Sequence, residues 1–314
     1  MTRLINDGWP PLTGELREYL QKWPGDPSLA VVGQEGPIAG HDTGQTYRLA
    51  SVTKLLTALT ILDAAESGEI SLHDQSGPKG ATVLHLLAHA SGINFEDGRV
   101  KAPVGSRRIY SNAGIDLAAE HLTAATGKDF KDEMRDRVLE PLGMLHTTLR
   151  GAPSKGAEGT ITDIALLAHE LLRPKLFAGP VEKLATLAYP NLSGFLPGFG
   201  HHLNNDWGAG AEIRGTKSPH WTSPNNSPGT FGHFGVSGSF LWVDRQAGIA
   251  CAALSTVDFD EWATRMWPET STVVLSSYSG PGGKRPETTG TVTQAHDLVE
   301  AAPSGATTQF VPGA

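Results

Sequence analysis

One stretch near the N-terminus, LASVTKLLTALTILDAAESG at residues 49–68, is apolar around most of its circumference. Its leucines and Val52 recur at helical spacing, and alanine and isoleucine side chains extend the apolar surface beyond one face. A helix of this kind has to be buried on most sides. The rest of the chain must therefore surround it, and Gly68 marks its predicted end.

The start of this helix carries Ser51 and Lys54, three residues apart. Residues at this spacing share a helix face, so the hydroxyl and the amine can meet. A lysine whose pKa is lowered by burial can take the proton of an attacking serine, and a helix N-terminus offers N–H groups to an oxyanion. The pattern alone equally fits a core helix whose lysine reaches the surface.

The bulk composition is that of an ordinary globular protein. The 314 residues are 39% apolar and 18% charged, enough for one large domain or two interleaved subdomains. The net charge of −8 argues against nucleic acid as a partner, and the single Cys251, in an apolar run, predicts a buried structural thiol. Because neither a signal peptide nor a membrane span is visible, we expect no membrane association and a cytoplasmic protein.

Predicted strands lie towards both ends of the chain and predicted helices lie between them. Helices are expected over residues 14–23, 82–90, 112–127, 129–142, 162–172 and 257–268, in addition to the apolar one. Thr82 and Thr162 are the predicted caps of two of them. Strands are expected in SLAVVG, TYRLAS, WGAGAEIRG, TFGHFG, SGSFLWVD and GIACAALS, with a hairpin between the last two.

This order of elements predicts an α/β (α+β) fold, in which an antiparallel sheet flanked by helices receives an inserted all-helical subdomain. We expect one catalytic domain over residues 1–278, with a sheet lobe from about 12–70 and 200–275 and a helical lobe from about 71–199. A cleft between the lobes is expected to hold the site. Residues 279–314, rich in Pro, Gly, Thr and Ser, are expected to form a disordered tail.

A second motif, Tyr110-Ser111-Asn112, stands directly before a predicted helix. A tyrosine at this place could share a proton with Lys54, and an asparagine could hold the lysine or a substrate carbonyl. Tyr110 and Asn112 are therefore candidate site residues.

A third motif, His233-Phe234-Gly235, lies on a predicted edge strand. Gly235 would let a substrate approach the backbone closely. The N–H of the next residue, Val236, could pair with that of Ser51 as oxyanion donors.

Together the three motifs resemble the penicillin-recognising serine hydrolases, a family that includes class C β-lactamases, DD-peptidases and esterases of the same fold. The resemblance covers about residues 29–255, and its segments follow one another in the order typical of the family. It is carried by YRLASVTKLLTALTILDAAESGEISLHD, ATVLHLLAHASGI, YSNAGIDLAAEHLTAATG with LEPLGMLHTTL, and GTITDIALLAHELL.

The resemblance implies a role for each motif residue. Ser51 would be the acylated nucleophile, Lys54 its general-base partner, and Tyr110 an acid/base acting on the leaving group or the deacylating water. Asn112 would orient the substrate. His233 would occupy the first position of the third motif, which is Lys or His in the family. Which of Lys54 and Tyr110 takes the first proton is left open, and we expect no cofactor and no metal.

Two departures from the family pattern bear on the substrate. The third motif begins with His233, where class C β-lactamases typically have Lys, and continues with Phe234, where penicillin-binding members usually carry Thr. That threonine hydroxyl typically binds a substrate carboxylate, which a phenyl ring cannot do. We therefore expect an esterase-like serine hydrolase that cleaves an uncharged small-molecule ester or amide, with its oligomeric state open.

Several alternatives remain at this point. The protein could be a β-lactamase or a D-alanyl-D-alanine carboxypeptidase of the penicillin-binding type, or a catalytically silent binding or scaffold member. An α/β-hydrolase would need G-x-S-x-G, and GVSGS at 235–239 fails at its last position. His85 with His89, or His201 with His202, could ligate a metal, but no partner motif accompanies either pair.

Overall fold

The computed structural model describes residues 9–279 of the chain. Within that range no helix is both long enough and apolar enough to cross a membrane. The predicted tail lies outside the described residues, apart from Ser279.

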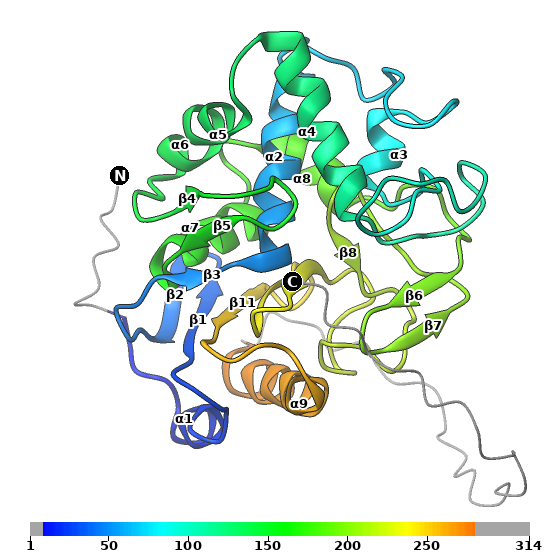
Figure 1. Cartoon of the computed structure of the whole chain (residues 1–314). Coiled ribbons are helices and arrows are strands. Elements are labelled where there is room, and N and C mark those ends of the chain that lie inside the picture. The colour runs from blue at the N-terminus through cyan, green and yellow to red at the C-terminus, as the bar shows by residue number, and fades with distance from the viewer. Residues whose placement is uncertain (1–8, 280–314) are drawn as a thin grey trace, which may run out of the picture. The chain divides into compact units, whose positions relative to one another are not determined.

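A six-stranded antiparallel sheet forms the centre of the described residues, in the order β2-β1-β11-β10-β9-β8 (Figure 1). Its strands are β1 (Ser28–Gly33), β2 (Gly36–His41), β8 (Glu212–Ile213), β9 (Phe231–Gly235), β10 (Ser239–Asp244) and β11 (Ile249–Leu254). The sheet is thus built from both ends of the chain, as the sequence predicted. The predicted hairpin between the last two strands is also confirmed, because β10 pairs with β11.

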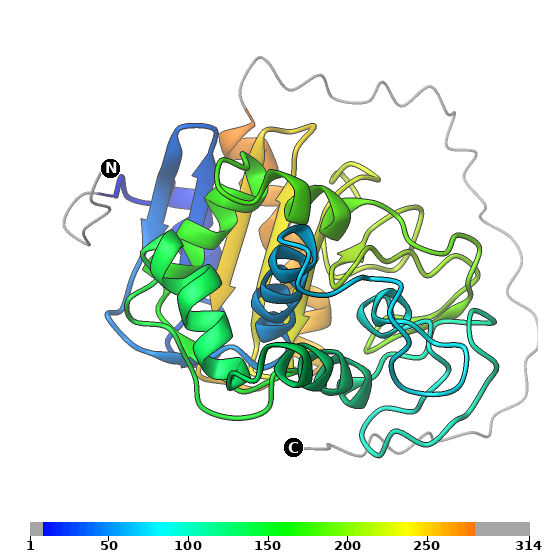
Figure 2. The ribbon, with the colours of Figure 1, turned by 90° about the horizontal axis from the view of Figure 1, so that it is seen from above.

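Helices cover both faces of this sheet (Figure 2). They are α2 (Thr53–Glu66) and α7 (Ile161–Leu172) on one face, and α1 (Gly14–Leu20) and α9 (Glu261–Tyr278) on the other. Because side chains alternate along a strand, Leu241 of β10 joins the core beneath α2 and α7, whereas Trp242 joins the core beneath α9. The sheet is therefore buried on both faces.

The remaining helices follow α2 in the middle of the chain, and all of them except α8 were predicted. They are α3 (Val83–Leu87), α4 (Asn112–Thr126), α5 (Phe130–Met134), the π-helical η2 (Arg135–Leu139), α6 (Glu140–Leu142) and α8 (Ala178–Ala185). Two small sheets, β3-β5-β4 and β6-β7, accompany them. Their strands are β3 (Tyr47–Arg48), β4 (Thr148–Leu149), β5 (Ala157–Gly159), β6 (Gly194–Leu196) and β7 (Gly200–His202).

Several predicted boundaries were wrong. Thr160, not Thr162, caps α7, because its Oγ1 accepts from the N–H of Asp163 at 3.3 Å. The strand predicted over WGAGAEIRG contains only the two residues of β8 within the sheet. The closing helix was expected to end at Pro268 but continues to Tyr278, because buried residues on both sides of the proline hold it against the second core.

Candidate active site

Ser51 lies in a single 3-10 turn, η1 (Ala50–Val52), that leads directly into α2. The residue before it, Ala50, has a φ of +43°, a left-handed conformation that costs a non-glycine residue free energy and is typical of functional turns. Lys54, one turn further, donates from Nζ to Ser51 Oγ at 3.1 Å. Its side chain is fully buried, so the alternative of a surface-reaching lysine was wrong.

Two further acceptors hold the Lys54 amine. Nζ donates to Asn112 Oδ1 at 2.6 Å and to the Ser154 carbonyl at 2.8 Å. Burial lowers the pKa of Lys54 to about 7, against the opposing charges of Asp116 and Glu96. A substantial fraction of the amine is therefore neutral near pH 7 and can accept a proton.

The loop that supplies the Ser154 carbonyl is fixed on both sides. Thr57 of α2 donates from Oγ1 to the Pro153 carbonyl at 2.6 Å. Asp116 accepts from the N–H and the hydroxyl of Ser154 at 2.8 and 3.0 Å. Asp116 lies four residues after Asn112, hence on the same face of α4. One face of α4 thus positions both acceptors of the Lys54 amine: Asn112 directly, and the Ser154 carbonyl through Asp116.

Tyr110 approaches Ser51 from the segment before α4. Its hydroxyl donates to Ser51 Oγ at 2.8 Å, and Lys54 Nζ lies 4.8 Å from its ring centre. Burial raises the pKa of Tyr110 above its ordinary value, so the resting side chain is a neutral phenol. A protonated hydroxyl and a partly neutral amine thus meet at one oxygen.

His89 clamps the backbone on both sides of Tyr110. Its carbonyl accepts from the N–H of Ile109 at 3.0 Å, and its Nδ1 accepts from the N–H of Ser111 at 3.2 Å. Its ring lies 4.7 Å from the Tyr110 ring. His89 has a φ of +54°, which ends α3 before the predicted boundary and turns the chain towards Tyr110.

Strand β9 lies directly against the Ser51 turn. A Cβ added at Gly235 would stand 3.1 Å from the Ser51 nitrogen and 2.6 Å from the Leu49 carbonyl oxygen. The prediction of an edge strand was wrong, because β8 lies outside β9 and pairs with its first two residues. Gly235 itself lies beyond the two residues that β8 covers. Val236 follows Gly235 and is 42% exposed.

The His233 side chain lies on the Tyr110 side of β9. Its ring is 5.8 Å from that of Tyr110 and 5.5 Å from that of Trp207. Its Nδ1 hydrogen-bonds the Phe234 carbonyl at 2.7 Å. Burial lowers the pKa of His233 to about 3, so the imidazole is neutral and brings no positive charge to the site.

The Phe234 side chain is not brought to Ser51. Strand alternation turns it to the opposite face of the sheet, where it is 9% exposed in the core beneath α9. Its ring lies 5.6 Å from that of Trp267 and 5.5 Å from that of Phe259. The third motif therefore presents an imidazole and a glycine backbone towards Ser51, with its phenyl ring in the core.

Comparison with known proteins identifies the family and the fold. The Beta-lactamase family model matches residues 28–270. The chain belongs to the Beta-lactamase family. A beta-lactamase from Mycobacterium bovis, known as a crystal structure, is 44% identical with a TM-score of 0.82, over 84% of this chain and 100% of that one. The predicted family and fold are thereby confirmed.

Two other relatives are more distant. The D-alanyl-D-alanine-carboxypeptidase/endopeptidase AmpH of Escherichia coli (strain K12) is 27% identical over 145 residues, 34% of this chain and 38% of AmpH. The match thus spans well under half of that relative. The LovD6 mutant of simvastatin synthase from Aspergillus terreus has a TM-score of 0.68 at 16% identity, over 84% of this chain and 93% of that one, a likeness of fold alone.

The Beta-lactamase family has a serine hydrolase fold. The structure also shows contacts at the site that the sequence motifs did not predict. Ser154 accepts from Lys54, His89 accepts from the Ser111 backbone, and Asp116 holds Ser154 in place. No local pattern marks Ser154 or Asp116, because their partners are distant in sequence. His89 lay in a segment that carries the family resemblance, and its contact with the Tyr110 segment was not predicted.

The histidine pairs considered as metal ligands have other contacts. His85 Nδ1 lies 2.8 Å from the Thr82 hydroxyl in the capping box of α3, and His202 Nε2 lies 3.1 Å from the Phe199 carbonyl. In the part of the chain that is described, no group of three or more His, Cys, Asp or Glu side chains is placed to hold a metal ion.

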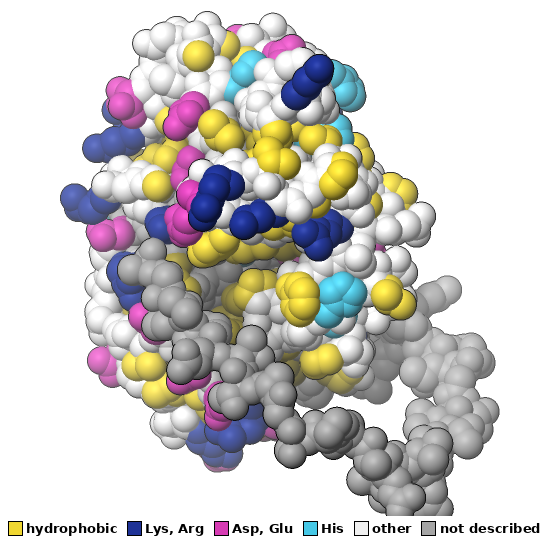
Figure 3. Space-filling view, turned by 45° about the vertical axis from the view of Figure 1, so that its right-hand side comes forward, with side chains coloured by type: hydrophobic (Ala, Val, Ile, Leu, Met, Phe, Trp, Pro, Cys, Tyr) yellow, Lys and Arg dark blue, Asp and Glu magenta, His cyan; other side chains and the backbone are white. Residues whose placement is uncertain are grey.

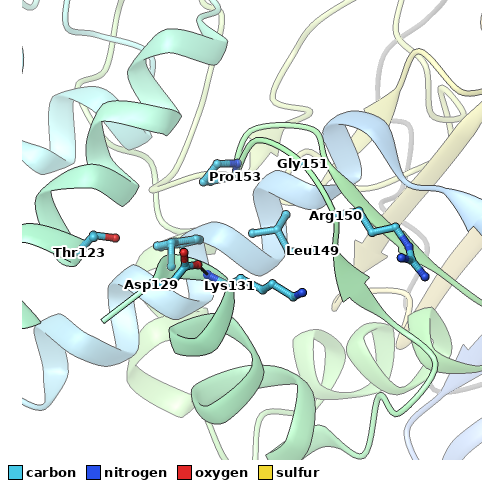
Figure 4. Close-up of a pocket in the computed structure, with 8 residues that line it drawn as sticks. Thr123, Asp129, Lys131, Leu149, Arg150, Gly151 and Pro153 are labelled. Carbon is cyan, nitrogen blue, oxygen red and sulfur yellow. Dashed lines mark hydrogen bonds between the residues drawn. The ribbon is translucent and has the colours of Figure 1, made fainter. Parts of the chain in front are cut away.

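A hollow of about 470 Å³ lies beside Gly151 and Pro153 (Figure 4). It lies between the start of α5, with Asp129 and Lys131, and the residues after β4, with Arg150 and Pro153. It is separate from the Ser51 cluster, whose residues are not in its lining. The face of the molecule in Figure 3 shows hydrophobic side chains gathered beside several Lys and Arg side chains.

Proposed function

We propose that the protein is an esterase-like serine hydrolase that works through an acyl-enzyme on Ser51. The observation that carries the choice of substrate is the His233 ring: its Nδ1 is engaged by the Phe234 carbonyl at 2.7 Å and burial lowers its pKa, so it brings no positive charge to a substrate carboxylate. Phe234 adds no hydroxyl beside it, since its ring lies in the core. An uncharged ester or amide suits such a site better than a carboxylate-bearing one.

The first step is attack of Ser51 Oγ on the acyl carbon. The neutral Lys54 amine, 3.1 Å away, takes the hydroxyl proton and becomes an ammonium held by Asn112 and Ser154. Tyr110 is a poorer first base, because burial keeps its phenol protonated. We therefore assign the first proton to Lys54.

The oxygen of the tetrahedral intermediate carries the negative charge. The N–H groups of Ser51 and Val236 would donate to it, since β9 brings its backbone against the Ser51 turn. Collapse breaks the bond to the leaving oxygen, which receives the Tyr110 proton, and the Lys54 ammonium then returns its proton to the phenolate. Water attacks the acyl-enzyme in the same way, its proton passing to Lys54, and Ser51 Oγ leaves protonated.

Apolar side chains at the mouth of the site support an apolar acyl group. Phe95 is 41% exposed and its ring is stacked 5.8 Å from that of Tyr110. Val236 is exposed to a similar degree on the strand side. Apolar surface of this kind gains free energy when a substrate covers it.

A second candidate is a β-lactamase or a D-alanyl-D-alanine carboxypeptidase. It is favoured by the relatives themselves, the Mycobacterium bovis beta-lactamase at 44% identity and AmpH at 27%. Both reactions would use the same Ser51, Lys54 and Tyr110. They differ from the esterase reaction in that their substrates carry a carboxylate that the site must bind.

Steady-state kinetics separates the candidates. We expect wild-type protein to hydrolyse p-nitrophenyl butyrate with a kcat/KM at least about a hundredfold above that for benzylpenicillin or a D-alanyl-D-alanine peptide, the scale of discrimination that a missing polar contact imposes. Ser51→Ala should abolish turnover of every substrate. Faster turnover of penicillin or the peptide would favour the second candidate, and no Ser51-dependent turnover would indicate a silent member.

A further inference from the structure

The loop that follows α3 carries a carboxylate to the amide of Asn112. Its backbone is held by the start of α4, since the Phe95 carbonyl accepts from the N–H groups of Asn112 and Ala113 at 2.8 and 3.1 Å. The Ser111 hydroxyl donates to the Asn94 carbonyl at 2.6 Å. These contacts fix the residue that follows Phe95, which is Glu96.

Glu96 takes one of the two N–H groups of the Asn112 amide. Its Oε1 accepts from Asn112 Nδ2 at 2.7 Å, while Asn112 Oδ1 is taken by Lys54. The Glu96 side chain is 47% exposed, and Lys155 Nζ lies 3.2 Å from the same oxygen. Both ends of the Asn112 amide are thus engaged before a substrate arrives.

We infer that Glu96 sets the acyl-group specificity of the site, by rejecting substrates that bring a carbonyl oxygen to Asn112. Such an oxygen has to approach Asn112 Nδ2 beside the Glu96 carboxylate, which already holds one of its N–H groups and whose negative charge repels the oxygen. A saturated acyl chain makes no such demand and lies against the exposed Phe95 ring. The preferred substrates are therefore esters of simple aliphatic acids, and N-acylamino acid esters are disfavoured; this inference rests on the proposed esterase function.

The test compares two p-nitrophenyl esters of matched shape. The N-acetylglycyl ester carries an amide carbonyl, and the isohexanoyl ester has a methyl group in place of that oxygen. Both are to be assayed with wild-type protein, Glu96→Ala, Glu96→Gln and Asp97→Asn. Asp97 is the matched control, because it lies on the same loop, carries the same charge and pairs with Arg99 instead of Asn112.

We expect wild-type protein to favour the isohexanoyl ester by about tenfold or more in kcat/KM, the effect of one hydrogen bond. Glu96→Ala should lower this preference about tenfold, because it frees Asn112 Nδ2. Glu96→Gln should lower it less, since its amide oxygen can still accept from Nδ2, and Asp97→Asn should keep the ratio within about twofold. Taking the ratio of two esters cancels the effect of Glu96 on Lys54.

An unchanged ratio in both Glu96 variants, with turnover of both esters retained, would overturn this inference and leave the proposed esterase function standing. Equal loss of preference in Asp97→Asn would also overturn it, because the cause would then be the loop. If neither ester acylates Ser51 in wild-type protein, the proposed function fails and the inference fails with it.

Discussion

The protonation state of Lys54 decides whether Ser51 can be activated. Sequence spacing predicted that the two side chains would meet, because residues three apart on a helix share a face. It could not predict the acceptors of the amine, since the Ser154 carbonyl is 100 positions away along the chain and the Asn112 amide 58. The pKa of Lys54 depends on burial by residues that are distant in the sequence.

The pH profile of acylation should follow Lys54. Because only the neutral amine accepts a proton, the rate should rise about tenfold per pH unit below a midpoint near the pKa of about 7 and level off above it. Stopped-flow measurement of p-nitrophenol release between pH 5 and 9 tests this, with the spontaneous rate of Ser51→Ala subtracted. A flat profile would rule out Lys54 as the base.

Tyr110 should matter most when the leaving group is a poor one. In Tyr110→Phe we expect kcat to fall about a hundredfold or more for alkyl esters, because an alkoxide needs a proton to leave. The fall should be smaller for p-nitrophenyl esters, whose leaving group is stable without one. The control is Tyr189→Phe, a tyrosine that hydrogen-bonds His85 instead of Ser51. Equal losses for both ester classes would contradict the role of Tyr110 as acid.

At the scale of elements, the sequence predicted most helices and strands but not their exact limits. The predicted α4 and the strands β1, β9, β10 and β11 are present within a few residues, because their apolar periods are strong. The extension of α9 past Pro268 could not be predicted, since burial of Trp267 and Val274 in the second core outweighs the missing hydrogen bond. The orientation of the Phe234 side chain, away from Ser51, was also not predicted, because it depends on the register of β9 in the sheet.

The contact between β9 and the Ser51 turn should not tolerate a side chain at Gly235. Gly235→Ala places a methyl group 2.6 Å from the Leu49 carbonyl oxygen, so the turn must shift. We expect a loss of about 1–3 kcal/mol in the free energy of unfolding and at least about a tenfold loss of kcat. Gly229→Ala is the control, because a Cβ there meets nothing within 4 Å. Denaturant titration and ester turnover measure both effects, and equal behaviour of the two variants would refute the close contact.

Arg108 ties separate segments together behind Tyr110. It donates to the carbonyls of Ala88, Ala188, Tyr189 and Asn205. A lysine cannot reproduce this fork, so we expect Arg108→Lys to lower the free energy of unfolding by about 2–4 kcal/mol. Arg107→Lys should change it by less than about 0.5 kcal/mol, because Arg107 is exposed. Similar values for both variants in denaturant titration would contradict the structural role of Arg108.

At the scale of the whole molecule, one sheet separates two hydrophobic cores. The first lies under α2 and α7 and includes Leu241, and the second lies under α9 and includes Trp242. The composition and element order predicted this layered α/β fold, because strands at both chain ends can form one sheet only if the chain returns to it. The limits proposed for the catalytic domain, residues 1–278, stay a prediction.

Truncation tests that domain limit. Residues 1–284 form one compact unit by their contacts, so a chain ending at Lys284 should contain all that the fold needs. We expect its Tm to lie within about 2 °C of the full chain, a shift that corresponds to about 1 kcal/mol for a domain of this size. Ester turnover should also be retained. A loss of several degrees would place part of the stability in the residues removed.

Intact-mass spectrometry with peptide mapping tests the acyl-enzyme most directly. Wild-type protein, Ser51→Ala and Lys54→Met are each mixed with a p-nitrophenyl ester and quenched in acid within the first turnover. The account predicts an acyl adduct on Ser51 in wild-type protein, none in Ser51→Ala, and strongly slowed formation in Lys54→Met. An adduct on another residue, or one that forms equally fast without Lys54, would contradict it.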